Sequence, residues 1–244
     1  MAEVRDAQPP DEREAAAQGR LLARPQPPRE SLLAGIPPLA RGLHALGLSG
    51  ADGRDCLLYV PTSYNPERAS PLVLLLHGAG GAARGGVASL LPLADAAGML
   101  LLAPDARLQS WDIVMGSYGH DVAFIDRALT HTFARYMVDS THLAAGGFSD
   151  GASYALSLGL MNGDLFTHLI AFSPGFVAPG EWQGQPHIYI SHGTRDQVLP
   201  VNICGRRIAH MLRGDGYDVN YHEFDGPHTV PPEIAREAVR WFTS

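Results

Sequence analysis

The sequence predicts a three-layer α/β domain whose sheet is mostly parallel and begins with an antiparallel hairpin. Two patterns predict this fold class: short, continuously apolar runs typical of strands buried on both faces, and stretches of helical period that alternate with them. Of the 244 residues, 45% are hydrophobic and 18% are charged, which suits a domain with a sizeable core. We therefore assign residues 31–244 to one domain.

Residues 1–30 are polar, punctuated by proline and without periodicity, which predicts a disordered tail. The apolar runs 43–48 and 56–60 are joined by Ser-Gly-Ala-Asp-Gly-Arg-Asp and predict the hairpin. Further strands are expected at 71–76, 99–103, 143–145, 169–172, 187–190 and 219–224, and helices at 121–136, 152–160, 201–212 and 233–241. Ligands of such sheets bind at the carboxyl ends of the strands, so we expect the functional residues there.

A G-x-S-x-G motif spans residues 147–151, directly after a predicted strand and before a predicted helix. In that context the two glycines allow a sharp turn that leaves the Oγ atom of Ser149 accessible as a nucleophile. The N–H of Asp150, at the start of the helix, points to the same place. The bare motif is equally compatible with an ordinary turn, because glycine, serine and aspartate are common in turns. Its position relative to later residues favours the nucleophile.

Two later residues complete the pattern. A serine hydroxyl needs a base to take its proton, and the base must itself be oriented. Asp196 and His228 each follow a later predicted strand, 47 and 79 residues after Ser149. Serine, acid and histidine in this order predict a catalytic triad at the carboxyl edge of the sheet. The alternatives are that Asp196 caps a turn, that Asp225 is the acid, or that His228 is an ordinary surface histidine.

The loop after the 71–76 strand is the expected source of a second oxyanion donor. It reads His77-Gly78-Ala79-Gly80-Gly81, and its glycines allow a close backbone approach. We expect the backbone N–H groups of Ala79 and Asp150 to form the oxyanion hole, with the His77 side chain in a structural role.

The same loop offers one competing interpretation. Residues 78–83 also match the dinucleotide-binding pattern G-x-G-x-x-A, with Asp105 at the end of the next strand. That pattern normally opens its fold, whereas here a hairpin comes first. It also gives no reason for the positions of Ser149, Asp196 and His228, so we expect no nicotinamide or flavin cofactor.

Composition excludes several other classes of function. The net charge is −7 and no basic block is present, so no nucleic-acid partner is expected. All 18 basic residues are arginine, which excludes mechanisms that need a lysine. The sequence shows no metal-binding motif and no apolar run long enough for a membrane span, so neither a metal nor a membrane is expected. A missing secretory signal and only two cysteines suggest a cytoplasmic protein.

Four segments carry a resemblance to known families: LLLHGAGG, GGFSDGASYALSLGL, HGTRDQVLP and GPHTVP. From about residue 42 onward the chain resembles α/β-hydrolases, in particular the phospholipase/carboxylesterase group and the related polyhydroxybutyrate-depolymerase and feruloyl-esterase-like proteins. The resemblance implies Ser149 as nucleophile, Asp196 as acid and His228 as base. It departs from a common carboxylesterase pattern in which glutamine follows the nucleophile. Here Asp150 follows it, which argues against lysophospholipase or protein-thioesterase activity.

The expected activity is cofactor-free hydrolysis of small carboxylic esters through an acyl-enzyme. The alternatives are a peptidase or thioesterase with the same triad, and a non-catalytic binding protein with this fold. Only 14 residues separate the 169–172 and 187–190 strands, too few for the helical lid that many lipases insert there. A shallow, open site without a lid domain is therefore expected. Trp111 and Trp182 are candidates to border its substrate pocket, or else ordinary packing residues.

Overall fold

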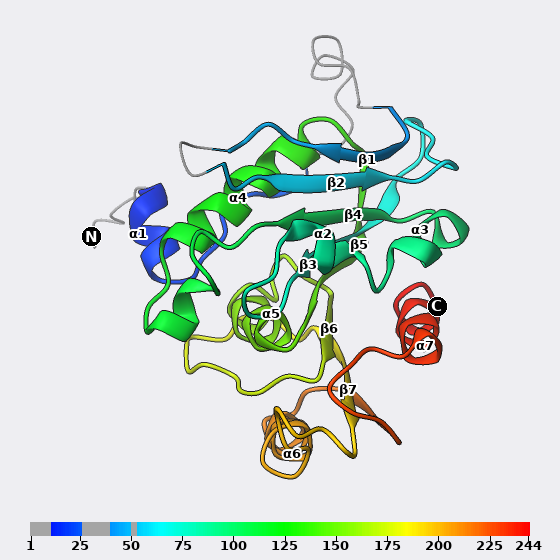
Figure 1. Ribbon diagram of the computed structural model, residues 1–244. Helices are drawn as coiled ribbons and strands as arrows, with labels where there is room; N and C mark the ends of the chain where they lie inside the picture. The colour runs from blue at the N-terminus through cyan, green and yellow to red at the C-terminus, as the bar shows by residue number, and fades with distance from the viewer. Residues whose placement is uncertain (1–10, 26–39, 50–52) are drawn as a thin grey trace, which may run out of the picture.

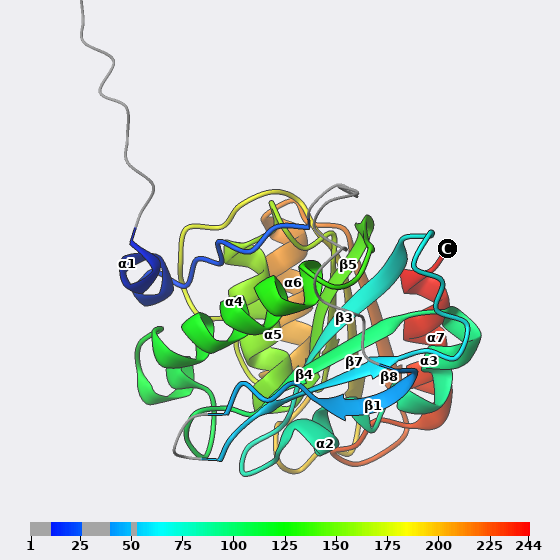
Figure 2. The same cartoon turned by 90° about the horizontal axis from the view of Figure 1, so that it is seen from above.

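The computed structural model describes residues 11–25, 40–49 and 53–244 and contains one eight-stranded sheet. Its order is β1-β2-β4-β3-β5-β6-β7-β8 (Figures 1 and 2). The strands are β1 Gly42–Ala45, β2 Cys56–Val60, β3 Ser70–Leu76, β4 Leu100–Pro104, β5 Val138–Phe148, β6 His168–Phe172, β7 His187–Gly193 and β8 Val219–Phe224. β1 and β2 pair antiparallel, as do β2 and β4, and every other pairing is parallel. The mostly parallel sheet with an antiparallel N-terminal pair is confirmed.

Helices cover both faces of this sheet and make it the middle of three layers. They are α1 Glu12–Ala17, α2 Ala83–Val87, α3 Leu91–Ala97, the 3₁₀ turn η1 Asp112–Met115, α4 His120–Phe133, α5 Asp150–Met161, α6 Gly205–Gly214 and α7 Pro232–Phe242. Buried residues of α4, α5 and α6 share one apolar cluster, and those of α2, α3 and α7 share another on the opposite face (Figure 2). In β3, Leu72 and Leu74 belong to the first cluster and Val73 to the second. The continuous apolar run is explained by burial on both faces.

The short helices α1, α2 and α3 were not anticipated from the sequence. Each has five to seven residues, too few for a helical period to stand out. The connection between β6 and β7, residues 173–186, contains no helix. The expected absence of a lid at this point of the chain is thus met.

Part of the predicted disordered tail is instead structured. Residues 11–25 contain α1 and then an extended segment in which Leu21 is completely buried. The side chain of Asn162, at the end of α5, accepts a hydrogen bond from Leu21 N–H and donates one to Gly19 O, each at 2.8 Å. Asp126 accepts hydrogen bonds from the N–H groups of Leu22 and Ala23. Residues 1–10 and 26–30 lie outside the described residues.

Three histidines form a row across neighbouring strands near their amino ends. His142, His168 and His187 lie on β5, β6 and β7, with ring centroids 6.0 Å and 5.4 Å apart. The outer two are paired with Asp139 and Asp218, whereas the ring of His168 packs edge-on against Trp241 and Phe242.

This row makes the free energy of unfolding depend on pH. Burial, and then the charges of His187 and His142, lower the pKa of His168 from 6.5 to about 4. Because the folded state disfavours protonated His168, its contribution to stability is present above pH 6.5 and lost as the pH falls towards 4. We expect a loss of roughly 1–2 kcal/mol, reduced by partial exposure of the ring. Urea midpoints measured from pH 7 to 4.5 should fall less steeply for His168→Phe than for wild type. The control His44→Phe should follow wild type, and equal slopes for all three would contradict the assignment.

Candidate active site

Ser149 occupies a strained turn between β5 and α5. Its φ and ψ are 59° and −122°, a left-handed conformation that is rare outside glycine and frequent at functional sites. Its N–H donates to Phe172 O at 3.0 Å, which ties the turn to the end of β6. A Cβ atom at Gly151 would overlap the Leu76 carbonyl oxygen, and one at Gly147 would lie 2.6 Å from it. The two motif glycines are therefore required by the close approach of β3.

His228 and Asp196 form a hydrogen-bonded chain with this serine. The Nε2 atom of His228 lies 2.9 Å from Ser149 Oγ, and its Nδ1 atom lies 2.6 Å from Asp196 Oδ2. Since ionised Asp196 can only accept, Nδ1 carries the proton and Nε2 is left free to take the serine proton. The Phe148 ring packs on the His228 ring at 4.6 Å. The structure thus brings together the three residues that the sequence analysis selected from three separate loops.

Asp196 is held in its charged form. Burial alone raises the pKa of this carboxyl, but hydrogen bonds from Leu199 N–H and His228 outweigh it and keep the pKa below its usual value. Oδ1 accepts from Val198 N–H at 2.9 Å and Leu199 N–H at 2.8 Å. The rival acid, Asp225, is instead exposed and paired with Arg195 at 2.8 Å.

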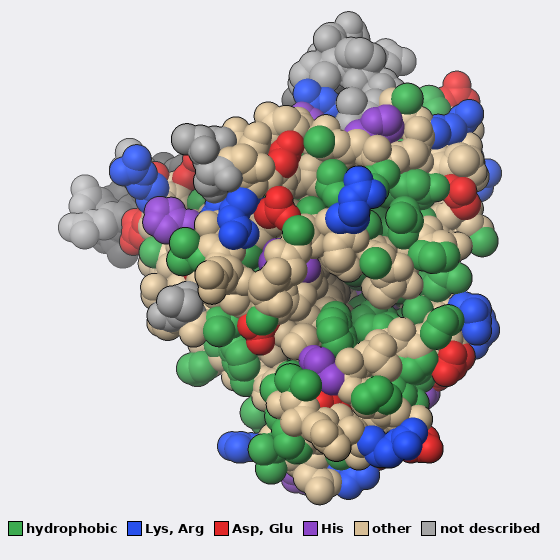
Figure 3. Space-filling view, viewed as in Figure 1, with side chains coloured by type: hydrophobic (Ala, Val, Ile, Leu, Met, Phe, Trp, Pro, Cys, Tyr) green, Lys and Arg blue, Asp and Glu red, His purple; other side chains and the backbone are tan. Residues whose placement is uncertain are grey.

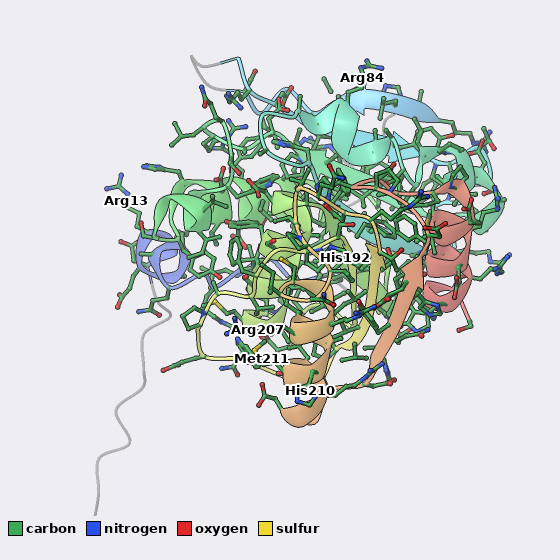
Figure 4. The ribbon with its side chains drawn as sticks, turned by 60° about the horizontal axis from the view of Figure 1, so that its bottom comes forward. Arg13, Arg84, His192, Arg207, His210 and Met211 are labelled. Atoms are coloured by element: carbon green, nitrogen blue, oxygen red, sulfur yellow. The ribbon has the colours of Figure 1, made fainter. Side chains whose placement is uncertain are left out.

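His192 supports the loop that carries Asp196. Its Nε2 atom is 2.7 Å from Leu199 O and 3.3 Å from Asp196 Oδ2. Burial lowers the pKa of His192, which keeps the ring neutral, and Nε2–H donates to Leu199 O. A Cβ atom at Gly205 would lie 2.6 Å from His192 Nδ1, because α6 begins directly against the ring (Figure 4). His192 thus shapes the loop that carries Asp196.

The His77–Gly81 loop lies beside Ser149. A Cβ atom at Gly78 would be 3.4 Å from the Cβ atom of Ser149. The His77 ring accepts from Ala106 N–H at Nε2, 3.1 Å away, and donates from Nδ1 to Gly78 O at 2.8 Å. Burial lowers the pKa of His77, consistent with this neutral form. The ring thereby fixes the loop that carries Ala79, while Asp150, as first residue of α5, has an N–H without a partner inside the helix.

The two candidate pocket tryptophans lie elsewhere. Trp111 is completely buried, donates from Nε1 to His77 O at 2.9 Å and stacks on Tyr154 at 5.1 Å. Trp111 thereby supports the His77–Gly81 loop, and it lines neither of the two grooves beside His228. Trp182 packs against Tyr217, and the adjacent Gln183 N–H donates to Leu160 O near the far end of α5. The structure does not bring Trp182 to the site.

Grooves flank His228 on two sides. One, of about 490 Å³, is lined by Leu76, Phe148 and Val230, by the His77–Gly81 loop and by residues of α2. The other, of about 520 Å³, is lined by Arg195, Gln197, Val198, Pro227 and His228. The space-filling view shows a hollow between α2 and the loop that leads into α7 (Figure 3). The site is open, with room for substrate groups on both sides of the imidazole.

Sequence reasoning missed the contacts that Ser110 and Phe148 make at the site. The Ser110 Oγ atom donates to Asp150 Oδ2 at 2.7 Å. Ser110 belongs to no motif, and Phe148 occupies a position of the G-x-S-x-G motif where any residue type is allowed, so the sequence marks neither contact.

Among residues 11–25, 40–49 and 53–244, no group of three or more His, Cys, Asp or Glu side chains could hold a metal ion. Within the same described ranges, every helix is too short or too polar to cross a membrane.

The strand order and the strained serine between β5 and α5 define an α/β-hydrolase fold. The chain belongs to the phospholipase/carboxylesterase family, whose model matches residues 99–240. The sequence resemblance to that family is therefore confirmed.

Curated relatives are similar to part of this chain. The chain is 30% identical over 167 residues to a probable feruloyl esterase C of Aspergillus clavatus, covering 65% of this chain and 60% of that protein. It is 29% identical over 164 residues to feruloyl esterase C of Emericella nidulans, covering 64% and 60%. The chain thus spans about 60% of the length of these curated relatives.

Solved structures share the fold. The crystal structure of esterase PE8 has a TM-score of 0.62 at 25% identity, covering 75% of this chain and 95% of that chain. A ferulic acid esterase from Anaeromyces mucronatus, solved in complex with ferulic acid, has a TM-score of 0.61 at 17% identity, covering 86% and 92%.

Proposed function

We propose that this protein hydrolyses carboxylic esters, with Ser149 as nucleophile, His228 as base and Asp196 as the acid that orients the base. The observation that carries the proposal is the continuous hydrogen-bond chain from Ser149 Oγ through His228 to Asp196. The hydrogen-bond chain begins at a serine placed on a strained turn beside a glycine-rich loop. This is the arrangement that acyl transfer requires.

The proposed reaction has two halves. Ser149 Oγ attacks the acyl carbon while His228 Nε2 takes its proton, and the N–H groups of Ala79 and Asp150 stabilise the oxyanion. Protonated His228 then gives its proton to the departing alcohol, and an acyl-enzyme ester remains on Ser149. A water molecule, activated by His228, attacks this ester and releases the carboxylic acid. Asp196 stays ionised throughout and stabilises the imidazolium.

The proposed substrates are small-molecule esters, including esters of aromatic acids. The grooves on both sides of His228 are open, and one has Leu76, Phe148 and Val230 in its lining. Two curated relatives named feruloyl esterase C support an aromatic acyl group. Peptides and thioesters remain the competing substrates for the same triad, because the machinery fixes acyl transfer and not the leaving group.

Replacing the nucleophile tests the proposal. Hydrolysis of p-nitrophenyl acetate, butyrate and octanoate and of methyl ferulate should occur with wild type. The Ser149→Ala variant should lose roughly 10⁴–10⁶-fold in kcat. A fluorophosphonate should label wild type at Ser149 and leave the variant unlabelled. Ser140→Ala changes an exposed serine of β5, the strand before Ser149, and should behave as wild type.

Two results would contradict the proposal. Hydrolysis that survives in Ser149→Ala would remove the nucleophile assignment. An absence of ester hydrolysis, together with cleavage of a peptide or thioester panel, would move the function to another acyl substrate. The chain-length profile of the active wild type would measure the length of the acyl group that the site accepts.

A further inference from the structure

The proposed oxyanion donors come from two separate segments of the chain. Ala79 lies on the loop after β3, and Asp150 is the first residue of α5. An oxyanion hole acts only when its donors are held at a fixed distance from the position that the charged oxygen will take. The two segments approach each other directly where Gly78 lies against Ser149, and contacts from a third segment add to this in setting the spacing between Ala79 and Asp150.

One loop contacts the Ala79 segment at several points. This β4–η1 loop comprises residues 105–111. Its Gln109 O accepts a hydrogen bond from Gly80 N–H at 2.8 Å. In the same loop, Ala106 N–H donates to the His77 ring and Trp111 Nε1–H donates to His77 O. The loop is thus bonded to the residues on both sides of Ala79.

The same loop contacts the Asp150 segment through one side chain. Ser110 Oγ donates to Asp150 Oδ2 at 2.7 Å, and both side chains are half-buried. A hydrogen bond to a carboxylate is about twice as strong as one between neutral groups. Through Ser110, the β4–η1 loop joins the start of α5 to the loop that carries Ala79.

We propose that the Ser110–Asp150 hydrogen bond is a positioning contact that holds the two oxyanion donors at their working separation. This inference rests on the proposed esterase function. In this arrangement the Asp150 carboxylate accepts from Ser110 and fixes the geometry of the oxyanion hole. The backbone N–H of Asp150 binds the oxyanion. Ser110 and the Asp150 side chain are positioning groups and touch no reacting atom.

The effect should appear in the transition state more than in substrate binding, because the charge on the oxygen develops there. Removing a whole oxyanion donor lowers kcat by about 10²–10³-fold. Shifting a donor from its position, without removing it, should lower kcat by a smaller factor. We expect Ser110→Ala and Asp150→Ala each to lower kcat about tenfold, with KM changed less than twofold. A trifluoromethyl ketone, whose adduct with Ser149 carries an oxyanion, should bind about tenfold more weakly.

The experiment is a double-mutant cycle on p-nitrophenyl butyrate hydrolysis. Rates are expressed per active site, counted by fluorophosphonate labelling, so that a loss of folded protein does not lower kcat. Ser110→Ala/Asp150→Ala should be no slower than either single variant, because both remove the same contact. Asp150→Asn, which keeps an acceptor for Ser110, should recover kcat relative to Asp150→Ala. Thr141→Ala is the matched control, since its Oγ1 donates to the Asp139 carboxylate at 2.6 Å near the other end of β5. It should leave kcat unchanged.

The outcomes separate the two proposals. A wild type that hydrolyses esters while Ser110→Ala keeps its kcat, or shows losses that add to those of Asp150→Ala, would overturn only the positioning contact. A wild type without esterase activity would overturn the proposed function and the positioning contact with it.

Discussion

Replacing Asp196 with asparagine should lower kcat for ester hydrolysis about 10⁴-fold while the fold is retained. The reason is the orientation that the amide will adopt. Asp196 Oδ1 accepts from the N–H groups of Val198 and Leu199. The carbonyl oxygen of the asparagine must keep these two donors satisfied, so its NH₂ group will face His228 Nδ1. That nitrogen must then accept, which moves the imidazole proton to Nε2 and removes the acceptor for the Ser149 proton.

A matched variant separates this effect from a general loss of charge. Asp225→Asn removes a carboxylate three residues before His228, but Asp225 is exposed and paired with Arg195. Its kcat should stay within a factor of about two of wild type, as expected for an exposed ion pair. Both variants are measured with p-nitrophenyl butyrate, and circular dichroism confirms the fold. If Asp196→Asn lost less than tenfold in kcat, or if Asp225→Asn lost more than Asp196→Asn, the acid role would belong to another residue.

The proposed triad could be selected from the sequence because each of its residues follows a strand that the sequence makes visible. The runs before Ser149 and Asp196 are short and apolar, the run before His228 mixes apolar and polar residues, and parallel strands place their carboxyl ends at one edge. The structure joins the three residues by hydrogen bonds of 2.9 Å and 2.6 Å. The buried middle strands were predictable for the same reason, since burial on both faces leaves a continuous apolar pattern.

Contacts between loops were not predictable. Ser110 and Asp150 are 40 residues apart, and their hydrogen bond depends on the shape of the β4–η1 loop. Trp111 and Trp182 are both aromatic residues in glycine-rich loops, yet one is buried under the His77–Gly81 loop and the other packs near the far end of α5. No periodic pattern distinguishes these positions, because loop conformation is set by turns and side-chain hydrogen bonds.

The N-terminal segment shows a second limit of pattern reading. Residues 11–25 lack the periodicity of an amphipathic element, so the sequence predicted disorder there. In the structure, polar side chains from elsewhere hold the backbone of this segment, because Asn162 accepts from Leu21 N–H and Asp126 accepts from Leu22 N–H. Hydrogen bonds to the backbone place no demand on the side chains of the segment they hold. Such docking is therefore invisible in the segment's own composition.

Asn162→Ala should lower the free energy of unfolding by about 3 kcal/mol, because buried backbone groups would lose their partners. Asn162 is completely buried, and its Nδ2 donates to Gly19 O and to Leu158 O, each at 2.8 Å. Its Oδ1 accepts from the N–H of Leu21, whose side chain is also fully buried. A destabilisation of this size should lower Tm by roughly 6–12 °C. Urea unfolding followed by circular dichroism measures the change directly.

Two comparisons show whether the loss comes from docking of the N-terminal segment. Asn65→Ala removes an exposed asparagine whose Oδ1 accepts from Glu67 N–H, and it should cost less than about 0.5 kcal/mol. Deletion of residues 1–25 should itself destabilise the protein, since Ala15, Ala16 and Leu21 are buried. In the deleted protein the Asn162 amide would be exposed to water, so Asn162→Ala should then cost much less than in the full chain. Equal costs in the two backgrounds would show that Asn162 stabilises α5 alone, and that residues 11–25 are not docked by it.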